Sequence, residues 1–325
     1  MKIRVDSCKF VFLLPTIGDR RQTQNQSIRM RPTHLFFIAS ILSICVPALA
    51  NPTTTTAPTT APSVSPFEAQ ILYPGTNTQH KPIARVYPPP GCDLLTLHAK
   101  DGTQITALFG KPLSPNPGGK HFTLLYFYGN GMCLATSLSV FNQFRNLGFS
   151  VITPDYEGYG LSEGRPSEPG CYAAADACYN YLLTRSDIDP ARIVGTGWSL
   201  GAAVAIDLAN RKPLAGLATF SAFTSINDMS HILAPNVPVG LLITSRFDNL
   251  AKIGNVPCPL FLAHGTLDPL VPFEMQSLLG QAAKSPVTLV HVDYAGHNDI
   301  FIVGGDSLYR QLKTFVNNLP PAKLQ

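Results

Sequence analysis

Short apolar runs alternate along the chain with longer segments of helical composition. Runs such as Phe122–Tyr128 and Phe149–Pro154 are typical of strands that are buried on both faces, and segments such as Leu134–Leu147 are typical of helices. The predicted strands are Leu94–Ala99, Gln104–Phe109, Phe122–Tyr128, Phe149–Pro154, Arg192–Trp198, Leu214–Ser221, Leu260–His264 and Val287–Val292. The predicted helices are Leu134–Leu147, Cys171–Leu183, Leu200–Arg211, Pro272–Lys284 and Asp306–Asn317, the last with Asp306 as its cap.

The order of these elements predicts an α/β fold. The first two strands flank Lys100–Thr103, whose Asp-Gly pair favours a hairpin. The repeated strand–helix units that follow predict a mostly parallel sheet of about eight strands with helices on both faces. Ligands bind such sheets at the carboxyl ends of the strands, so chemistry is expected there.

The first 50 residues have a pattern typical of an export leader. Met30 and Arg31 precede an apolar run, Leu35–Val46, and Pro47–Ala50 ends in an A-x-A cleavage pattern. The run is shorter than the about 20 residues that span a bilayer, so we expect a signal peptide over residues 30–50, cleavage after Ala50 and an exported, periplasmic or secreted protein. An uncleaved anchor, a lipoprotein at Cys45, and Met30 as the true start remain alternatives.

A Thr/Pro-rich linker over residues 51–66 separates the leader from one folded domain, residues 67–325. The linker has too few large apolar residues to order itself. Seven of the 24 Lys and Arg residues but only two of the 20 acidic residues lie within residues 1–50, which leaves a formal charge of about −1 on the rest. This balance argues against a nucleic-acid partner.

Gly197-Trp198-Ser199-Leu200-Gly201 has the G-x-S-x-G pattern of a nucleophile elbow. A serine at the tip of a sharp strand-to-helix turn sits in strained backbone, and glycine two residues on either side removes collisions. The predicted strand before it and the small residues of the predicted helix after it supply the required context. Ser199 is therefore the candidate nucleophile.

A serine nucleophile needs a base, and the base needs an acid to orient it. His297 is the candidate base, because it follows the last strand in a glycine-containing loop. Asp268, which follows an earlier strand, is the candidate acid, with Asp293 and Asp299 as rivals. The remaining histidines after Ser199 (His231, His264 and His291) are interpreted as structural or as lying outside the site.

Backbone N–H groups are expected to bind the oxyanion. One is that of Leu200, directly after the nucleophile. The other is that of Asn130, in the Tyr128–Met132 loop after an early strand, with Gly131 or Met132 as alternatives.

Five segments together resemble the α/β-hydrolase superfamily, in particular its alpha/beta-hydrolase-domain branch of membrane-associated depalmitoylases and bacterial relatives. They are Tyr126–Gly131, Pro154–Glu168, Gly197–Gly201, His264–Asp268 and Gly296–Ile300. The resemblance implies a serine hydrolase with Ser199, Asp268 and His297 as its triad, no metal or cofactor, a small-molecule or lipid acyl substrate, and peripheral membrane contact. Tyr128 departs from the family, which usually has histidine there.

The expected reaction is cleavage of a carboxylic ester or thioester through an acyl-enzyme. An acyltransferase, a peptidase on the same triad, and a non-catalytic binding protein on this scaffold remain alternatives. The stretch between Ser221 and Cys258 has room for a small lid, and its apolar residues are candidates for an acyl pocket. They are Ile232, Leu233, Val237, Val239, Leu241, Leu242 and Ile243.

Overall fold

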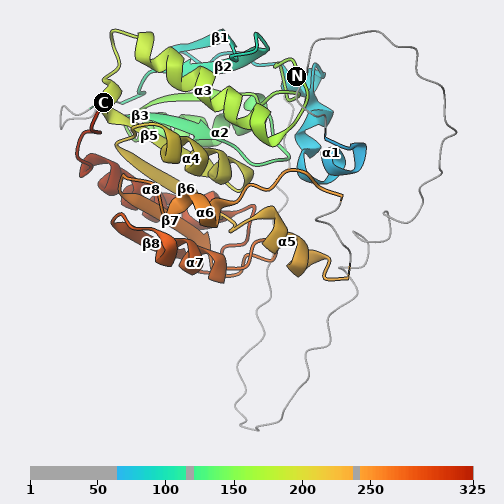
Figure 1. Ribbon diagram of the computed structural model, residues 1–325. Helices are drawn as coiled ribbons and strands as arrows, with labels where there is room; N and C mark the ends of the chain where they lie inside the picture. The colour runs from blue at the N-terminus through green and yellow to red at the C-terminus, as the bar shows by residue number, and fades with distance from the viewer. Residues whose placement is uncertain (1–63, 115–120, 237–241, 325) are drawn as a thin grey trace, which may run out of the picture. The chain divides into compact units, whose positions relative to one another are not determined.

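A computed structural model of the chain describes residues 64–114, 121–236 and 242–324. The predicted leader, residues 1–50, and nearly all of the predicted linker lie outside these residues. The described part is built on one eight-stranded sheet with strand order β1-β2-β4-β3-β5-β6-β7-β8 (Figure 1). The strands are β1 Cys92–His98, β2 Gln104–Gly110, β3 Thr123–Phe127, β4 Ser150–Pro154, β5 Ile193–Trp198, β6 Gly216–Phe220, β7 Leu260–Gly265 and β8 Val287–Val292.

The sheet is parallel from β4 to β8, as the repeated strand–helix units predict. Among the strands of the described residues, only β1 with β2 and β2 with β4 pair in antiparallel fashion. The β1–β2 hairpin turns at Gly102, which has a φ of 92° that suits glycine. The carboxyl ends of the six parallel strands therefore share one edge of the sheet, and the loops that follow them meet there.

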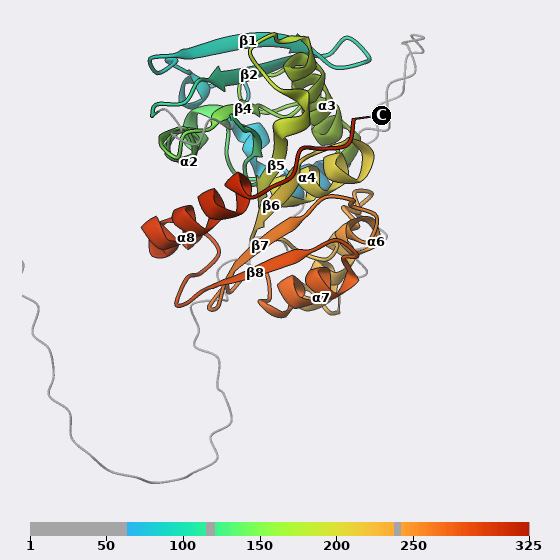
Figure 2. The ribbon, with the colours of Figure 1, turned by 90° about the vertical axis from the view of Figure 1, so that its left-hand side faces the viewer.

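Helices cover both faces of the sheet. Figure 2 shows α2 and α8 on one face and α3, α4, α6 and α7 on the other. Their bounds are α1 Pro66–Leu72, α2 Leu134–Asn146, α3 Glu168–Thr184, α4 Leu200–Arg211, α5 Ile226–Leu233, α6 Asn249–Ile253, α7 Glu274–Ala282 and α8 Ile300–Asn317, with 3₁₀ turns at Pro74–Thr78, Pro82–Ala84 and Pro190–Arg192. The α/β-hydrolase architecture expected from the sequence is thus the architecture of the molecule.

The last helix, α8, contains one more helical segment than the sequence predicts. Asp306 was expected to cap it, but α8 starts at Ile300, directly after Asp299. Gly305 has a φ of 42° and a ψ of −142°, which is not a helical conformation, so α8 consists of two helical segments joined at a kink there. The segment after Gly305 is the predicted helix, with Asp306 as its first helical residue and not its cap, whereas the segment over residues 300–304 was not predicted.

The segment between β6 and β7 holds two short helices, α5 and α6, and is tied to the N-terminal helix. Glu68 of α1 is fully buried, and its carboxylate accepts hydrogen bonds from the backbone N–H groups of Thr244 and Ser245, both at 2.8 Å. Burial by itself raises the pKa of Glu68, but hydrogen bonds from the side chain of Ser245, from both backbone N–H groups and from the side chain of Thr244 outweigh it and hold the pKa below its ordinary value. The sequence analysis did not predict α1, α5 or α6, which are all short. No helix in the described parts of the chain is both long and apolar enough to cross a membrane.

Candidate active site

Ser199 occupies the sharp turn between β5 and α4. Its φ of 56° lies in the left-handed region, and its backbone N–H donates to the carbonyl of Phe220 at 2.9 Å. A Cβ on Gly197 would collide with the carbonyl oxygen of Gly201, and a Cβ on Gly201 would collide with that of Phe127. Both glycines of the motif are therefore required by the backbone, and the serine side chain is left at the carboxyl edge of the sheet.

His297 and Asp268 meet Ser199 at this edge. The Nε2 atom of His297 lies 2.8 Å from the Ser199 hydroxyl oxygen, and its Nδ1 atom lies 2.8 Å from Oδ2 of Asp268. A carboxylate can only accept, so Nδ1 carries the hydrogen and Nε2 is free to accept the serine proton. The three predicted residues, nearly 100 positions apart at the extremes, form one continuous chain of hydrogen bonds.

The Asp268 side chain is fully buried and held by several donors. Its Oδ1 accepts from the backbone N–H groups of Leu270 and Val271, both at 2.9 Å. Nε2 of His264 lies 3.3 Å from its Oδ2 and 3.0 Å from the carbonyl of Val271. Burial alone raises the pKa of Asp268, but the hydrogen bonds from His264 and His297 outweigh it and hold the pKa well below its ordinary range.

The other aspartates and histidines considered for the site form no hydrogen bond with Ser199 or His297 through their side chains in the described residues. Asp299 accepts a hydrogen bond from the N–H of Gly296 at 2.7 Å and so shapes the loop that carries His297. Asp293 is exposed. His291 lies in β8 as expected, with its ring 4.8 Å from that of Phe273, and His231 lies in α5.

The proposed oxyanion donors lie on neighbouring pieces of backbone. Leu200 is the first residue of α4, and Asn130 follows β3, where its carbonyl accepts from the N–H of Gly75 at 2.9 Å. Within the described residues, neither the Leu200 N–H nor the Asn130 N–H donates a hydrogen bond. A Cβ on Gly201 would lie only 2.7 Å from the carbonyl oxygen of Tyr128, so the loop starts against the first turn of α4.

Tyr128, the departure from the family pattern, has a hydrogen-bonding role of its own. Its hydroxyl donates to Oδ1 of the buried Asp155 at 2.7 Å. The N–H of Leu134, at the other end of the loop, donates to the same oxygen at 2.6 Å. Asp155 therefore holds both ends of the candidate oxyanion loop.

The lid residues that were expected to line an acyl pocket differ in exposure. Ile232 and Leu233 of α5 are 50% exposed and Leu242 is 46% exposed, whereas Ile243 is buried. Val237, Val239 and Leu241 lie outside the described residues. The acyl pocket therefore stays a prediction.

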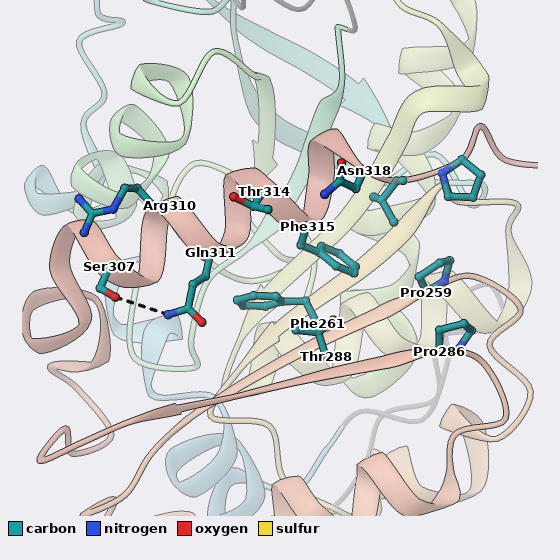
Figure 3. A pocket seen from close by; sticks show the side chains of 12 residues that line it. Pro259, Phe261, Pro286, Thr288, Ser307, Arg310, Gln311, Thr314, Phe315 and Asn318 are labelled. Atoms are coloured by element: carbon teal, nitrogen blue, oxygen red, sulfur yellow. Dashed lines mark hydrogen bonds between the residues drawn. The ribbon is translucent and has the colours of Figure 1, made fainter.

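A separate cavity of about 570 Å³ lies between α8 and the strands β7 and β8 (Figure 3). Pro259 and Pro286, which line it, directly precede these strands, whereas Asp268 and His297 follow their carboxyl ends. At about 3.3 Å per residue, the strands put this cavity at the opposite edge of the sheet from Ser199. It does not form part of the candidate active site.

Comparisons with known proteins identify the family of the chain. The sequence model of the Alpha/beta hydrolase family matches residues 129–247, which include Ser199. The chain is 33% identical to an uncharacterised protein of Mycobacterium tuberculosis, over 70% of this chain and 80% of that protein. It is 32% identical to alpha/beta hydrolase domain-containing protein 17B of Xenopus tropicalis, over 66% and 72% of the two chains.

Solved structures show the same fold at lower identity. An esterase of Pyrococcus furiosus superposes with a TM-score of 0.59 at 18% identity, covering 70% of this chain and 92% of the esterase. The proposed catalytic residues lie at the carboxyl edge of the sheet, where the loops after the parallel strands meet. The chain belongs to the α/β-hydrolase family.

Proposed function

We propose that this protein is a serine hydrolase that cleaves carboxylic esters or thioesters through an acyl-enzyme intermediate. The observation that carries the proposal is the hydrogen-bonded chain from Ser199 through His297 to Asp268, with both links at 2.8 Å. Hydrolase chemistry is common to the family, and the named residues and the ester or thioester substrate are the proposal.

The first half of the reaction forms the acyl-enzyme. The Ser199 oxygen attacks the acyl carbonyl carbon while Nε2 of His297 takes the hydroxyl proton. Asp268 keeps the hydrogen on Nδ1 and stabilises the imidazolium that forms. Its lowered pKa matters here, because the carboxylate stays charged while His297 gains a proton. The N–H groups of Leu200 and Asn130 bind the oxygen that becomes negative.

The second half releases the acyl group. His297 returns its proton to the leaving alcohol or thiol as the carbon–oxygen or carbon–sulfur bond breaks. A water molecule then gives a proton to His297 and attacks the acyl carbon, which forms a tetrahedral intermediate. As the bond from the acyl carbon to the Ser199 oxygen breaks, His297 returns that proton to the Ser199 oxygen, which regenerates the hydroxyl and frees the carboxylic acid. If another nucleophile replaced water, the same residues would catalyse acyl transfer.

An ester is the first substrate class that we propose. The Pyrococcus furiosus protein is an esterase. We extend esterase activity to this chain as part of the proposal. A lipid acyl substrate, peripheral membrane contact and export by a leader ending at Ala50 belong to the same proposal. Sequencing of the N-terminus of the exported protein tests the leader, and a mature chain that keeps residues before Ala50 would refute it.

The test of the nucleophile is Ser199→Ala in the domain from residue 51 to 325, assayed with acyl esters and thioesters of graded chain length. We expect kcat to fall by about 10³–10⁶-fold, with folding intact and loss of labelling by a fluorophosphonate probe. Ser221→Ala is the matched control, since Ser221 follows the neighbouring strand β6, is buried and also has a positive φ of 48°. Near-normal turnover by Ser199→Ala would exclude the proposal, and failure of the wild-type protein to react with the probe would favour a binding protein.

A further inference from the structure

Trp198, the residue before the proposed nucleophile, contacts the residue proposed as base in two ways. Its indole N–H donates to the backbone carbonyl of His297 at 3.2 Å. Its ring faces the His297 imidazole, with centroids 5.6 Å apart and planes tilted by 36°. The hydrogen bond fixes the backbone of His297, and the ring contact limits the rotation of its side chain.

The same indole ring also packs against the start of the candidate oxyanion loop. A Cβ added to Gly129 would lie 3.0 Å from two carbon atoms of the ring, so the glycine backbone lies close against the indole. Asn130, the proposed oxyanion donor, is the next residue. Phe301 of α8 borders the ring from a third direction, with centroids 6.3 Å apart in an edge-on arrangement.

These contacts place one rigid side chain between the loop that carries the base and the loop that carries an oxyanion donor. Both loops must keep a fixed position relative to the hydroxyl of Ser199, because proton transfer and oxyanion binding are sensitive to displacements of less than 1 Å. Trp198 directly precedes Ser199 in the chain, so contacts with its ring fix the positions of both loops relative to the nucleophile.

We propose that Trp198 is a positioning residue, which holds His297 and the Gly129–Asn130 backbone in register with Ser199. The inference rests on the proposed function, since it concerns the alignment of that reaction. Its role is separate from that of Asp268, which sets the tautomer of His297 through Nδ1, whereas Trp198 acts on the His297 carbonyl and ring face.

Two substitutions separate the two contacts. Trp198→Phe removes the N–H donor and keeps an aromatic ring, whereas Trp198→Ala removes both. We expect kcat to fall about tenfold in Trp198→Phe and about 100-fold in Trp198→Ala, with KM changed less than threefold, because alignment and not substrate binding is lost. Phe301→Leu is the control, since it disturbs packing on the ring without removing the N–H donor, and it should keep kcat within threefold of wild type.

A second readout does not depend on turnover. The hydrogen between Nδ1 of His297 and Asp268 is expected to give a low-field proton NMR signal, which is assigned by its loss in Asp268→Ala. We expect the signal to broaden or shift in Trp198→Phe and Trp198→Ala and to stay in place in Phe301→Leu. Urea midpoints of all variants show whether each protein is folded under assay conditions.

The outcomes separate the two proposals. If Ser199→Ala abolishes probe labelling while Trp198→Phe and Trp198→Ala keep wild-type kcat and an unchanged NMR signal, the positioning role is overturned and the hydrolase proposal stands. Equal losses in Phe301→Leu and Trp198→Phe would also overturn it, because they would reveal a general packing effect. If Ser199→Ala keeps wild-type activity, the proposed function itself fails, and the NMR comparison still tests whether Trp198 fixes His297.

Discussion

Two buried aspartates follow strands of the same sheet and have opposite electrostatic surroundings. Asp155 comes directly after β4 and Asp268 lies shortly after β7, so both lie at the carboxyl edge. Asp155 accepts hydrogen bonds from Tyr128 and from the N–H groups of Leu134 and Leu161. Asp268 accepts from two histidines as well as from backbone N–H groups.

The partners decide what burial does to each carboxyl group. Burial raises the pKa of Asp155 above its ordinary value even with three hydrogen bonds, so its ionisation costs folding free energy above about pH 3.9. The hydrogen bonds from His264 and His297 instead lower the pKa of Asp268 below its value in the unfolded chain. Its ionised form therefore stabilises the fold above about pH 3.9, and this contribution is lost as the pH falls through the lower pKa of the folded state. We infer that Asp155 holds a loop, whereas Asp268 is suited to stabilise a protonated imidazole.

The largest expected effect separates these roles by activity. Asp268→Asn should lower kcat by about 10³–10⁴-fold in an ester assay, because an amide can direct its N–H toward His297 and favour the wrong tautomer. Urea unfolding should show that the variant is still folded under assay conditions, so that unfolding does not account for the loss of kcat. Asp299→Asn is the control, since an amide oxygen can still accept from the Gly296 N–H, and losses of equal size in both variants would contradict the assignment of the acid.

Asp155→Asn should act on stability more than on chemistry. One carboxylate oxygen accepts from Tyr128 and Leu134 and the other accepts from Leu161, so an amide would point its N–H group at a backbone N–H. We expect the free energy of unfolding, measured in urea, to fall by about 1–3 kcal/mol, and kcat to fall no more than about tenfold. Asp306→Asn should change neither quantity, because the Asp306 side chain is 95% exposed. A loss of activity as large as that of Asp268→Asn would remove the contrast between the two aspartates.

Tyr128→Phe tests one contact of the same cluster. Removing the hydroxyl leaves Asp155 with one donor fewer in a buried place, and the free energy of unfolding should fall by about 1–2 kcal/mol. Tyr126→Phe is a matched control on β3, since the buried Tyr126 hydroxyl has no hydrogen-bond partner among the described residues. Thermal or urea unfolding of the two variants compares them directly, and equal stability would show that the Tyr128 hydroxyl contributes nothing.

The smallest expected effect depends on pH. Burial and the nearby Asp101 raise the pKa of Glu157, two residues beyond Asp155, from 4.5 to about 7. The folded protein therefore holds this proton more tightly than the unfolded chain, and wild-type stability decreases as the pH rises from about 4.5 to 7. Because the side chain is only partly buried, Glu157→Gln should be more stable than wild type by about 1 kcal/mol at pH 8, with no gain at pH 4. Urea unfolding at both pH values measures this, and a gain that does not depend on pH would contradict it.

The local features of the site followed from the sequence because their physics is local. The G-x-S-x-G spacing predicts a turn whose backbone leaves no room for side chains at Gly197 and Gly201, and the structure has that turn. Apolar runs predicted all eight strands, and chain order placed His297 and Asp268 in loops after strands.

The short helices α1, α5 and α6 were missed although the side chains of Ser65, Ser225 and Asp248 cap their N-termini, which is a local signal. Of α8, the segment after Gly305 was predicted and the segment before it was missed.

The sequence by itself determined the α/β order of elements, the strained serine turn and the residue types that can act as base and acid, because each depends on near neighbours in the chain. Only the tertiary structure decided that Asp268 accepts hydrogen bonds from two histidines, whereas Asp155 accepts one from Tyr128. It also decided that Trp198 lies between the loop of His297 and the loop of Asn130. Those contacts join residues far apart in the chain, and their geometry depends on how the sheet brings its carboxyl ends to one edge.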